Sequence, residues 1–207
     1  MRLINNLLPL LLASSFPAHI VSIYAGKSAG KKFYLDDLSL TKDPKNHYTF
    51  MNNQTHVCYM KTVYFEHLAK QHPGKLSFVH VFPGVVITSN YGHPSLPWWF
   101  KLLWSLVKPL VQCFVAIEPE ESGKRNLYLA GPRYPPRGSS QKGGGGVVGT
   151  DGVVGGGAYS CNYDGETYKP ETVLPKQWRE RGLEAKVVEH MEAVFAAGDR
   201  GKKFVEK

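Results

Sequence analysis

The stretch HPGKLSFVHVFPGVVITS, residues His72–Ser89, decides the fold of this 207-residue chain. Its centre, Leu76–Val81, is a dense, largely apolar run of strand-forming residues, with one Pro-Gly pair before it and another after it. Such a run is typical of a strand that is buried on both faces in a parallel sheet. Because ligands of parallel sheets bind beyond the carboxyl ends of the strands, we expect Pro83–Thr88 to lie beside a ligand.

A strand, a helix and a strand are predicted in that order around this segment. The first strand is expected at Ala18–Ala25, where AHIVSIYA follows a proline. The helix is expected within residues 47–70, because apolar residues there recur at three- and four-residue spacing and share one face: Val57, Met60, Tyr64 and Leu68. A helix between two strands is the crossover that joins parallel strands, so the sequence predicts an α/β fold.

Further elements are predicted on both sides of this crossover. Residues 1–13 are expected to form the end of a helix, in preference to a signal peptide, because a strand follows at once. A tryptophan-rich helical region is expected within residues 91–117, then a short helix that begins at Pro119, and then a third strand at Arg125–Ala130. An amphipathic helix is expected within Leu174–Ala197.

The chain is basic, with a formal net charge of +8 and a pI near 9.3. This charge is typical either of an ordinary solvated basic surface or of affinity for an anion such as a nucleotide, a nucleic acid or an acidic membrane. The cationic residues are scattered and do not alternate with aromatic residues on one module, so nucleic acid is not an expected partner. The three cysteines, Cys58, Cys113 and Cys161, are odd in number and far apart, which fits a reducing, cytoplasmic environment. The histidines lack the spacing of zinc ligands, and no metal site is expected.

The segment Trp98–Ile117, WWFKLLWSLVKPLVQCFVAI, is long enough to cross a bilayer. It contains four residues that are costly at that depth: Lys101, Lys108, Pro109 and Gln112. We therefore expect a buried or lid-like pair of helices here. An alternative is an anchor at a membrane surface, because tryptophans and lysines combine in this segment.

One glycine-rich pattern imitates a phosphate-binding loop. Gly26–Lys32, GKSAGKK, follows the first predicted strand. Its glycines are one residue too close together, and Lys32 stands where a serine or threonine would reach magnesium. An NTPase is therefore not expected.

With these elements in place, the chain resembles the short-chain dehydrogenase/reductase family. LLPLLLAS (Leu7–Ser14) is similar to the end of the family's long central helix, and HIVSIYAG (His19–Gly26) to the strand that follows it. Pro83–Thr88 matches the family's Pro-Gly-x-x-x-Thr segment, and PEESGKR (Pro119–Arg125) resembles a stretch common before its last strand. Three further runs are most similar to a divergent fungal branch found among secondary-metabolite pathways: FYLDDLSL, EHLAKQHPGKLSFVHVFPG and NYDGE.

The resemblance implies a partial Rossmann-like parallel sheet with flanking helices, lacking the N-terminal βαβ units of the family. The expected division places the C-terminal portion of the Rossmann-like domain at 1–131. Residues 132–157 are expected to form a flexible loop, because nine of the fifteen residues from 143 to 157 are glycine. Residues 158–207 are expected to form a C-terminal extension that carries the amphipathic helix.

The resemblance also implies an oxidoreductase that uses NADP or NAD. Its expected substrate is a small hydrophobic natural product with a hydroxyl or ketone group. The expected cofactor-binding residues are Pro83, Gly84, Val86 and Thr88, beside the nicotinamide ring. The oligomeric state is left open.

The family's catalytic Tyr-x-x-x-Lys is absent from this chain. The family's spacing places the tyrosine at Asn53 or Gln54 and the lysine four residues later, and no tyrosine here has a lysine at that distance. In the family the tyrosine exchanges the substrate proton and the lysine lowers its pKa. No catalytic residue is therefore predicted. The alternative function is a truncated or catalytically degenerate member without redox activity, either a binding module or a gene-model fragment.

Overall fold

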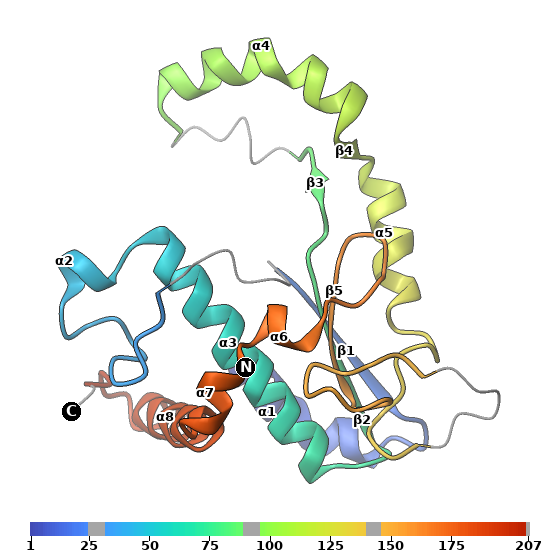
Figure 1. Ribbon diagram of the computed structural model, residues 1–207, viewed down its shortest axis with the longest axis vertical. Helices are drawn as coiled ribbons and strands as arrows, with labels where there is room; N and C mark the ends of the chain where they lie inside the picture. The colour runs from blue at the N-terminus through green and yellow to red at the C-terminus, as the bar shows by residue number, and fades with distance from the viewer. Residues whose placement is uncertain (25–31, 89–95, 140–145, 206–207) are drawn as a thin grey trace.

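The computed structural model of the chain describes residues 1–24, 32–88, 96–139 and 146–205. Its centre is a parallel sheet with the strand order β1–β2–β5, and helices pack on it (Figure 1). These strands are β1 (Ala18–Ile23), β2 (Leu76–Val81) and β5 (Ala158–Cys161). The predicted α/β class with a parallel sheet is confirmed. Apart from Lys32, the Gly26–Lys32 pattern lies outside the described residues.

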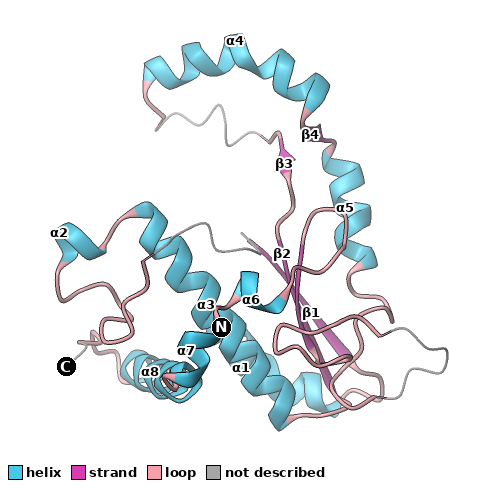
Figure 2. Ribbon diagram, viewed as in Figure 1, coloured by secondary structure: helices cyan, strands magenta, loops and turns pink. Residues whose placement is uncertain are grey.

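Helices make up most of the remaining regular structure (Figure 2). A short second sheet pairs β3 (Val85–Val86) with β4 (Ala116–Ile117). The helices are, in chain order, α1 (Arg2–Ala13), α2 (Pro44–His47), α3 (Phe50–Gln71), α4 (Trp98–Phe114), α5 (Pro119–Tyr128), α6 (Pro170–Val173), α7 (Lys176–Glu180) and α8 (Leu183–Asp199).

Helix α3 is the crossover that joins β1 to β2. The side chain of Thr49 caps its first turn by accepting a hydrogen bond from the backbone N–H of Asn52. After the helix, Gly74 has a φ of +73°, a left-handed conformation that glycine adopts without strain. The predicted helix and first two strands are confirmed, and all six residues of β2 are buried as expected.

The two faces of the sheet carry separate hydrophobic clusters. On the face towards α3, Phe78 of β2 stacks on Phe65 of α3 with ring centroids 4.8 Å apart, and Val187 of α8 belongs to the same cluster. On the opposite face, Val79 clusters with Tyr159 of β5. Successive side chains of a strand point to opposite faces, so β2 supplies apolar residues to both clusters. This double burial explains the apolar run in the sequence.

The prediction of a third strand at Arg125–Ala130 is wrong. Most of these residues continue helix α5, which has Pro119 in its first turn. Ion pairs at i,i+4 spacing support the helix: Glu120 with Lys124, and Glu121 with Arg125. The strand that pairs with the free edge of β2 is instead β5, directly after the glycine-rich stretch.

The prediction of a buried or lid-like pair of helices at Trp98–Ile117 is also wrong. The structure has the single helix α4 here, with Pro109 inside it and without a buried residue. Helix α4 stands away from the three-stranded sheet, at the far end of the short β3–β4 pair (Figure 1). Within the described ranges, no helix has both the length and the apolar character needed to cross a membrane.

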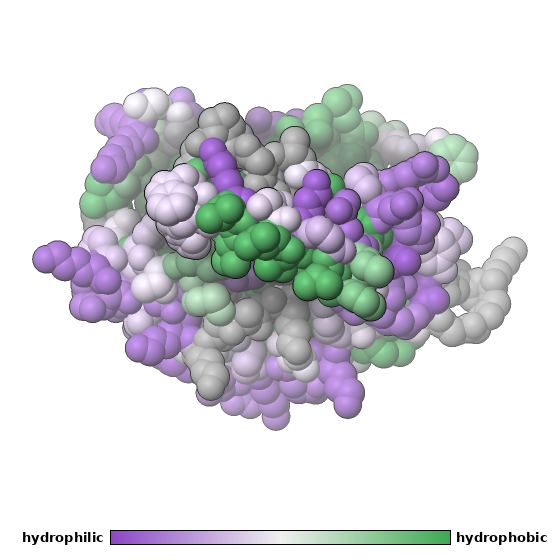
Figure 3. All heavy atoms as spheres, turned by 90° about the horizontal axis from the view of Figure 1, so that it is seen from above, coloured by the Kyte–Doolittle hydropathy of each residue, from purple (hydrophilic) through white to green (hydrophobic). Residues whose placement is uncertain are grey.

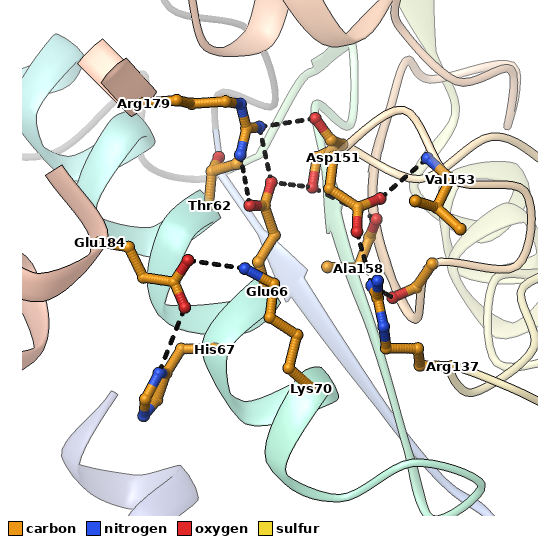
Figure 4. A network of polar contacts seen from close by, with 12 residues as sticks. Thr62, Glu66, His67, Lys70, Arg137, Asp151, Val153, Ala158, Arg179 and Glu184 are labelled. Carbon is orange, nitrogen blue, oxygen red and sulfur yellow. Dashed lines mark hydrogen bonds and ion pairs between the residues drawn. The ribbon is translucent and has the colours of Figure 1, made fainter. Parts of the chain in front are cut away.

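A network of polar contacts around a buried carboxylate joins three distant parts of the chain (Figure 4). The Glu66 carboxylate of α3 accepts two hydrogen bonds from the Arg179 guanidinium of α7, at 2.6 and 2.8 Å. Thr150 completes the group, because its hydroxyl donates to Glu66 at 2.7 Å and its carbonyl accepts from Arg179 at 2.7 Å. This network attaches part of the glycine-rich stretch to the helices. The division of the chain into three parts stays a prediction.

Candidate functional site

The Pro83-Gly84 turn leaves the carboxyl end of β2, where the sequence predicts a ligand. Gly84 has a φ of +76°, and a Cβ atom there would lie 2.6 Å from Cδ1 of Ile117 and 3.2 Å from Cβ of Tyr163. Ile117 belongs to β4, and Tyr163 lies just beyond β5. Glycine is therefore the residue that both the backbone conformation and the surrounding space require here.

A cavity of about 230 Å³ lies beside this turn. It is enclosed by the end of β2, by helix α5 and by residues 162–165 after β5. Its lining combines the apolar surface of Pro83 and Leu129 with the hydroxyl of Ser122 and the amide of Asn162. Apolar walls with a few polar groups are typical of a small-molecule site.

Of the four predicted cofactor-binding residues, the first two lie at this cavity and the other two lie farther along the chain. Pro83 lines it, and Gly84 packs against Tyr163, another of its lining residues. Val86 belongs to the β3–β4 pair, opposite Ile117. Thr88 is exposed and ends the described part of this segment. The structure brings Pro83 and Gly84 to the cavity, and the role of all four in cofactor binding stays a prediction.

Arg125, one of the two cationic residues that line the cavity with Lys124, is held by neighbours on two elements. Its Nε donates to Glu121 of the same helix at 2.8 Å, and its Nη1 donates to the carbonyl oxygen of Tyr163 at 3.3 Å. The guanidinium carbon also lies 5.9 Å from the centroid of the Tyr163 ring. The Glu121 carboxylate thus balances the charge of this arginine, which links α5 to the turn after β5.

A row of polar residues crosses the sheet on its other face. Ser22, His80 and Ser160 are neighbours in the register of β1, β2 and β5, each next to last in its strand. They share the face of Phe78, which packs on α3, because side chains two apart in a strand point the same way. Lys61 of α3 reaches this row, and its Nζ donates to Oγ of Ser22 at 3.0 Å.

Burial lowers the pKa of His80, which belongs to this row, and the pKa of Lys61, which contacts it. Loss of hydration, and to a lesser degree the charge of Lys61, lowers the pKa of His80 to about 3, so His80 is neutral at pH 7. Its two ring nitrogens are buried and have no hydrogen-bond partner among the described residues. Loss of hydration also lowers the pKa of Lys61, although nearby Cys58 opposes the shift. Lys61 therefore releases its proton more readily than an exposed lysine.

The aromatic ring of Tyr24 lies beside the ammonium group of Lys61. The Lys61 Nζ is 5.0 Å from the centroid of the Tyr24 ring, and that ring stacks on His80 with centroids 6.3 Å apart. Tyr24 is partly exposed, at 37%. Lys61 is thus placed between a hydroxyl and an aromatic face near the carboxyl end of β1.

No tyrosine of α3 works with Lys61 as the family's tyrosine would. Tyr59 is buried in the core, with its ring centroid 5.2 Å from that of Phe33. Tyr64 donates its hydroxyl proton to Asn5 at 2.9 Å. Cys58, one of the two positions at which the family's spacing puts its lysine (Val57 is the other), is buried, and burial raises the pKa of its thiol to about 11. Helix α3 therefore presents no tyrosine and lysine in the family's arrangement.

The polar row under α3 was not predicted from the sequence. A signal was present, because each of the three strands carries one polar residue at its next-to-last position: Ser22, His80 and Ser160. The row becomes recognisable only once the strand order is known. In the described part of the chain, no three His, Cys, Asp or Glu side chains gather closely enough to hold a metal ion.

Several known proteins are similar to this chain, although no protein-family model matches it. The protein "Oxidoreductase AN1596" of Emericella nidulans is 34% identical over 206 residues, which cover 94% of this chain and 58% of that protein. "Short-chain dehydrogenase/reductase SAT2" of Stachybotrys chartarum is 35% identical over 184 residues, covering 84% and 50%. "Oxidoreductase andH" of Emericella variicolor is 34% identical over 177 residues, covering 80% and 49%. The chain spans about half the length of the curated relatives it matches.

Proposed function

We propose that this chain, which belongs to the short-chain dehydrogenase/reductase family, takes part in the NAD(P)-dependent oxidation or reduction of a small hydrophobic molecule. The reacting group is a hydroxyl or a ketone, and the substrate class is a natural product of secondary metabolism. The names of the relatives support an oxidoreductase. The substrate class rests on the resemblance to the fungal branch described above.

The observation that carries this proposal is the Pro83-Gly84 turn at the carboxyl end of the central strand. Ligands of open parallel sheets bind at this end. Glycine is required at position 84, so the turn directs the following residues along one path towards β3. A cavity with apolar and polar walls adjoins the turn.

The groups around the turn fit the nicotinamide end of a dinucleotide. Backbone groups of residues 83–88 and the hydroxyl of Thr88 would hold the ring, while Ser122 and Asn162 supply a hydroxyl and an amide in the adjoining cavity. When bound, NAD(P) supplies the hydride transfer. The protein's part is to orient the ring and to exclude water from it.

We expect NADPH or NADH to bind to this chain and to bind less tightly when Thr88 is replaced by valine. The Thr88→Val substitution keeps the side-chain shape and removes one hydrogen-bonding hydroxyl, which is worth about a two- to tenfold increase in Kd. Titration of the full chain, followed by nucleotide fluorescence, measures the change. Thr172→Val, on α6, is the matched control and should leave the Kd unchanged. A chain that binds neither nucleotide would contradict the proposal.

A second candidate is a family member without redox activity. It is favoured by the missing tyrosine–lysine pair in α3. Such a protein would bind nucleotide or substrate at the turn without turning it over. Substitution of Lys61 can distinguish the two candidate functions, because its ammonium group contacts the polar row.

We expect Lys61→Met to stabilise the fold at neutral pH, by about 0.5–2 kcal/mol, and to remove any redox turnover. The lowered pKa shows that the ammonium is less favourably hydrated in the fold than in water. In the parent chain the free energy of unfolding should rise with pH from the lowered folded pKa up to the ordinary value of 10.5, because the unfolded chain holds this proton longer. Denaturant unfolding at several pH values tests whether Lys61→Met lacks this rise.

The control for this substitution is Lys75→Met, at an exposed lysine beside β2. It should change the free energy of unfolding by less than about 0.5 kcal/mol at every pH. If Lys61→Met keeps the turnover of the parent chain with a panel of ketones, Lys61 has no part in the chemistry. If the parent chain binds nucleotide but turns over no substrate, the second candidate is favoured.

A further inference from the structure

Helix α4 presents a continuous apolar face to solvent. Seven large apolar residues along it are each more than half exposed: Trp98, Trp99, Leu102, Leu103, Leu106, Leu110 and Phe114. Figure 3, which views the molecule from the end where α4 lies, shows hydrophobic residues gathered there in a band. A soluble monomer seldom exposes so many large apolar side chains side by side, and such a patch marks an interaction site.

The polar residues of α4 form a narrow stripe along one side of the helix. Lys101, Ser105, Lys108 and Gln112 are spaced by four, three and four residues, which places them in one row. All the remaining positions from Trp98 to Phe114 are apolar, apart from Cys113 and Pro109. The apolar arc is therefore much wider than the polar stripe, and the stripe carries only positive charge.

The sequence segment that contains α4 carries only positive charge. From Phe82 to Ile117 the sequence contains two lysines and no aspartate or glutamate, and the whole chain has a formal net charge of +8. An apolar face bordered by cations is complementary to a surface that is apolar inside and anionic outside. A bilayer that contains acidic phospholipids has this character.

We propose that α4 binds the surface of a membrane that contains anionic phospholipids. The helix would lie parallel to the surface, with its apolar arc among the acyl chains and with Lys101 and Lys108 directed to the headgroups. A helix of 17 residues is about 25 Å long, which suits this orientation. Trp98 and Trp99 at its start are of the residue type that collects at the interface between lipid and water.

A second copy of the chain suits this face less well. Two helices that pack together bury a narrow seam, about two positions in seven. The apolar arc of α4 extends far beyond such a seam, so a helix pair would leave several of its leucines and tryptophans in water. A lipid surface covers the whole arc at once.

The experiment uses the full chain with Trp178→Phe, so that the three remaining tryptophans, Trp98, Trp99 and Trp104, all lie in α4. It is mixed with vesicles of phosphatidylcholine and phosphatidylserine, or of phosphatidylcholine alone, with or without brominated acyl chains. We expect brominated lipid to quench the tryptophan fluorescence. Binding should be stronger to the anionic vesicles, and added salt should weaken it.

Three variants separate the contributions of apolar contact and charge. Leu102→Glu combined with Leu106→Glu should reduce vesicle binding by about a hundredfold, because two leucine side chains are lost from the lipid. Gln112→Glu adds one carboxylate on the polar stripe and should weaken binding to anionic vesicles by only about fivefold, far less than the double substitution. Lys108→Gln should weaken binding to anionic vesicles by about fivefold and leave binding to neutral vesicles unchanged. Circular dichroism checks that each variant keeps its helices.

Three results would overturn the proposal. One is recovery of all protein in the supernatant with both kinds of vesicle. Another is binding that the double glutamate variant does not reduce. The third is concentration-dependent dimerisation of the chain that needs Leu102 and Leu106 and that proceeds without any binding to lipid, which would assign the face to a second copy.

Discussion

Replacing Arg179 with methionine should lower the free energy of unfolding by about 3–5 kcal/mol. Glu66 is 1% exposed, and its carboxylate would lose two hydrogen bonds and its compensating charge. An unpaired buried carboxylate is far more costly than the lost attraction between the two groups. Denaturant unfolding of the two chains, followed by circular dichroism, measures the difference.

Two further variants test the origin of this loss. Lys176→Met removes an exposed i,i+4 partner of Glu180 on the same helix and should cost less than about 0.5 kcal/mol. Glu66→Met combined with Arg179→Met removes both charges, and we expect it to recover most of the stability. If the double variant is as unstable as Arg179→Met alone, the loss arises from packing and not from the unpaired carboxylate.

Replacing Gly84 with alanine should lower the free energy of unfolding by about 2–5 kcal/mol. The left-handed backbone at this position costs an alanine about 1–2 kcal/mol, and crowding against Ile117 and Tyr163 adds about 1–3 kcal/mol. The same substitution should displace the Pro83–Thr88 segment and weaken nucleotide binding. Unfolding and nucleotide titration of one preparation measure both effects.

Gly74→Ala is the matched control for this substitution. Gly74 has nearly the same φ, +73°, but no atom lies within 4 Å of the position that its Cβ would take. It should therefore show the backbone cost of about 1–2 kcal/mol alone and keep the parent's affinity for nucleotide. Equal losses at both glycines would show that the surroundings of Gly84 impose no further constraint.

The sequence identified the central strand and its crossover because their signals are local. Leu76–Val81 is apolar on both faces and is bounded by Pro-Gly pairs, so its limits in the structure are those predicted. Helix α3 follows from the spacing of its apolar residues; it begins three residues after the start of the predicted segment 47–70 and ends one residue beyond it. The Pro83-Gly84 turn was found for the same reason.

The errors arose where tertiary contacts decide the structure. Arg125–Ala130, RNLYLA, has the apolar content of a strand, but most of it continues helix α5, and Leu129 packs in the cluster of Val79 and Tyr159 on the sheet. The true third strand, AYSC, is four residues long and has no β-branched residue. Helix α4 is apolar enough for a core, and nothing local in its sequence shows that the fold leaves it exposed.

The position of β5 in the sheet has a consequence for the order in which the molecule assembles. Phe78 of β2 pairs with Ala158 of β5, so 80 positions separate the partners. The β1–α3–β2 unit closes over a shorter stretch, and it is continuous in the chain. Because closing a longer loop costs more entropy, this unit should form first and β5 should dock last. Until β5 arrives, one edge of β2 is open to any other strand, including that of a neighbouring nascent chain.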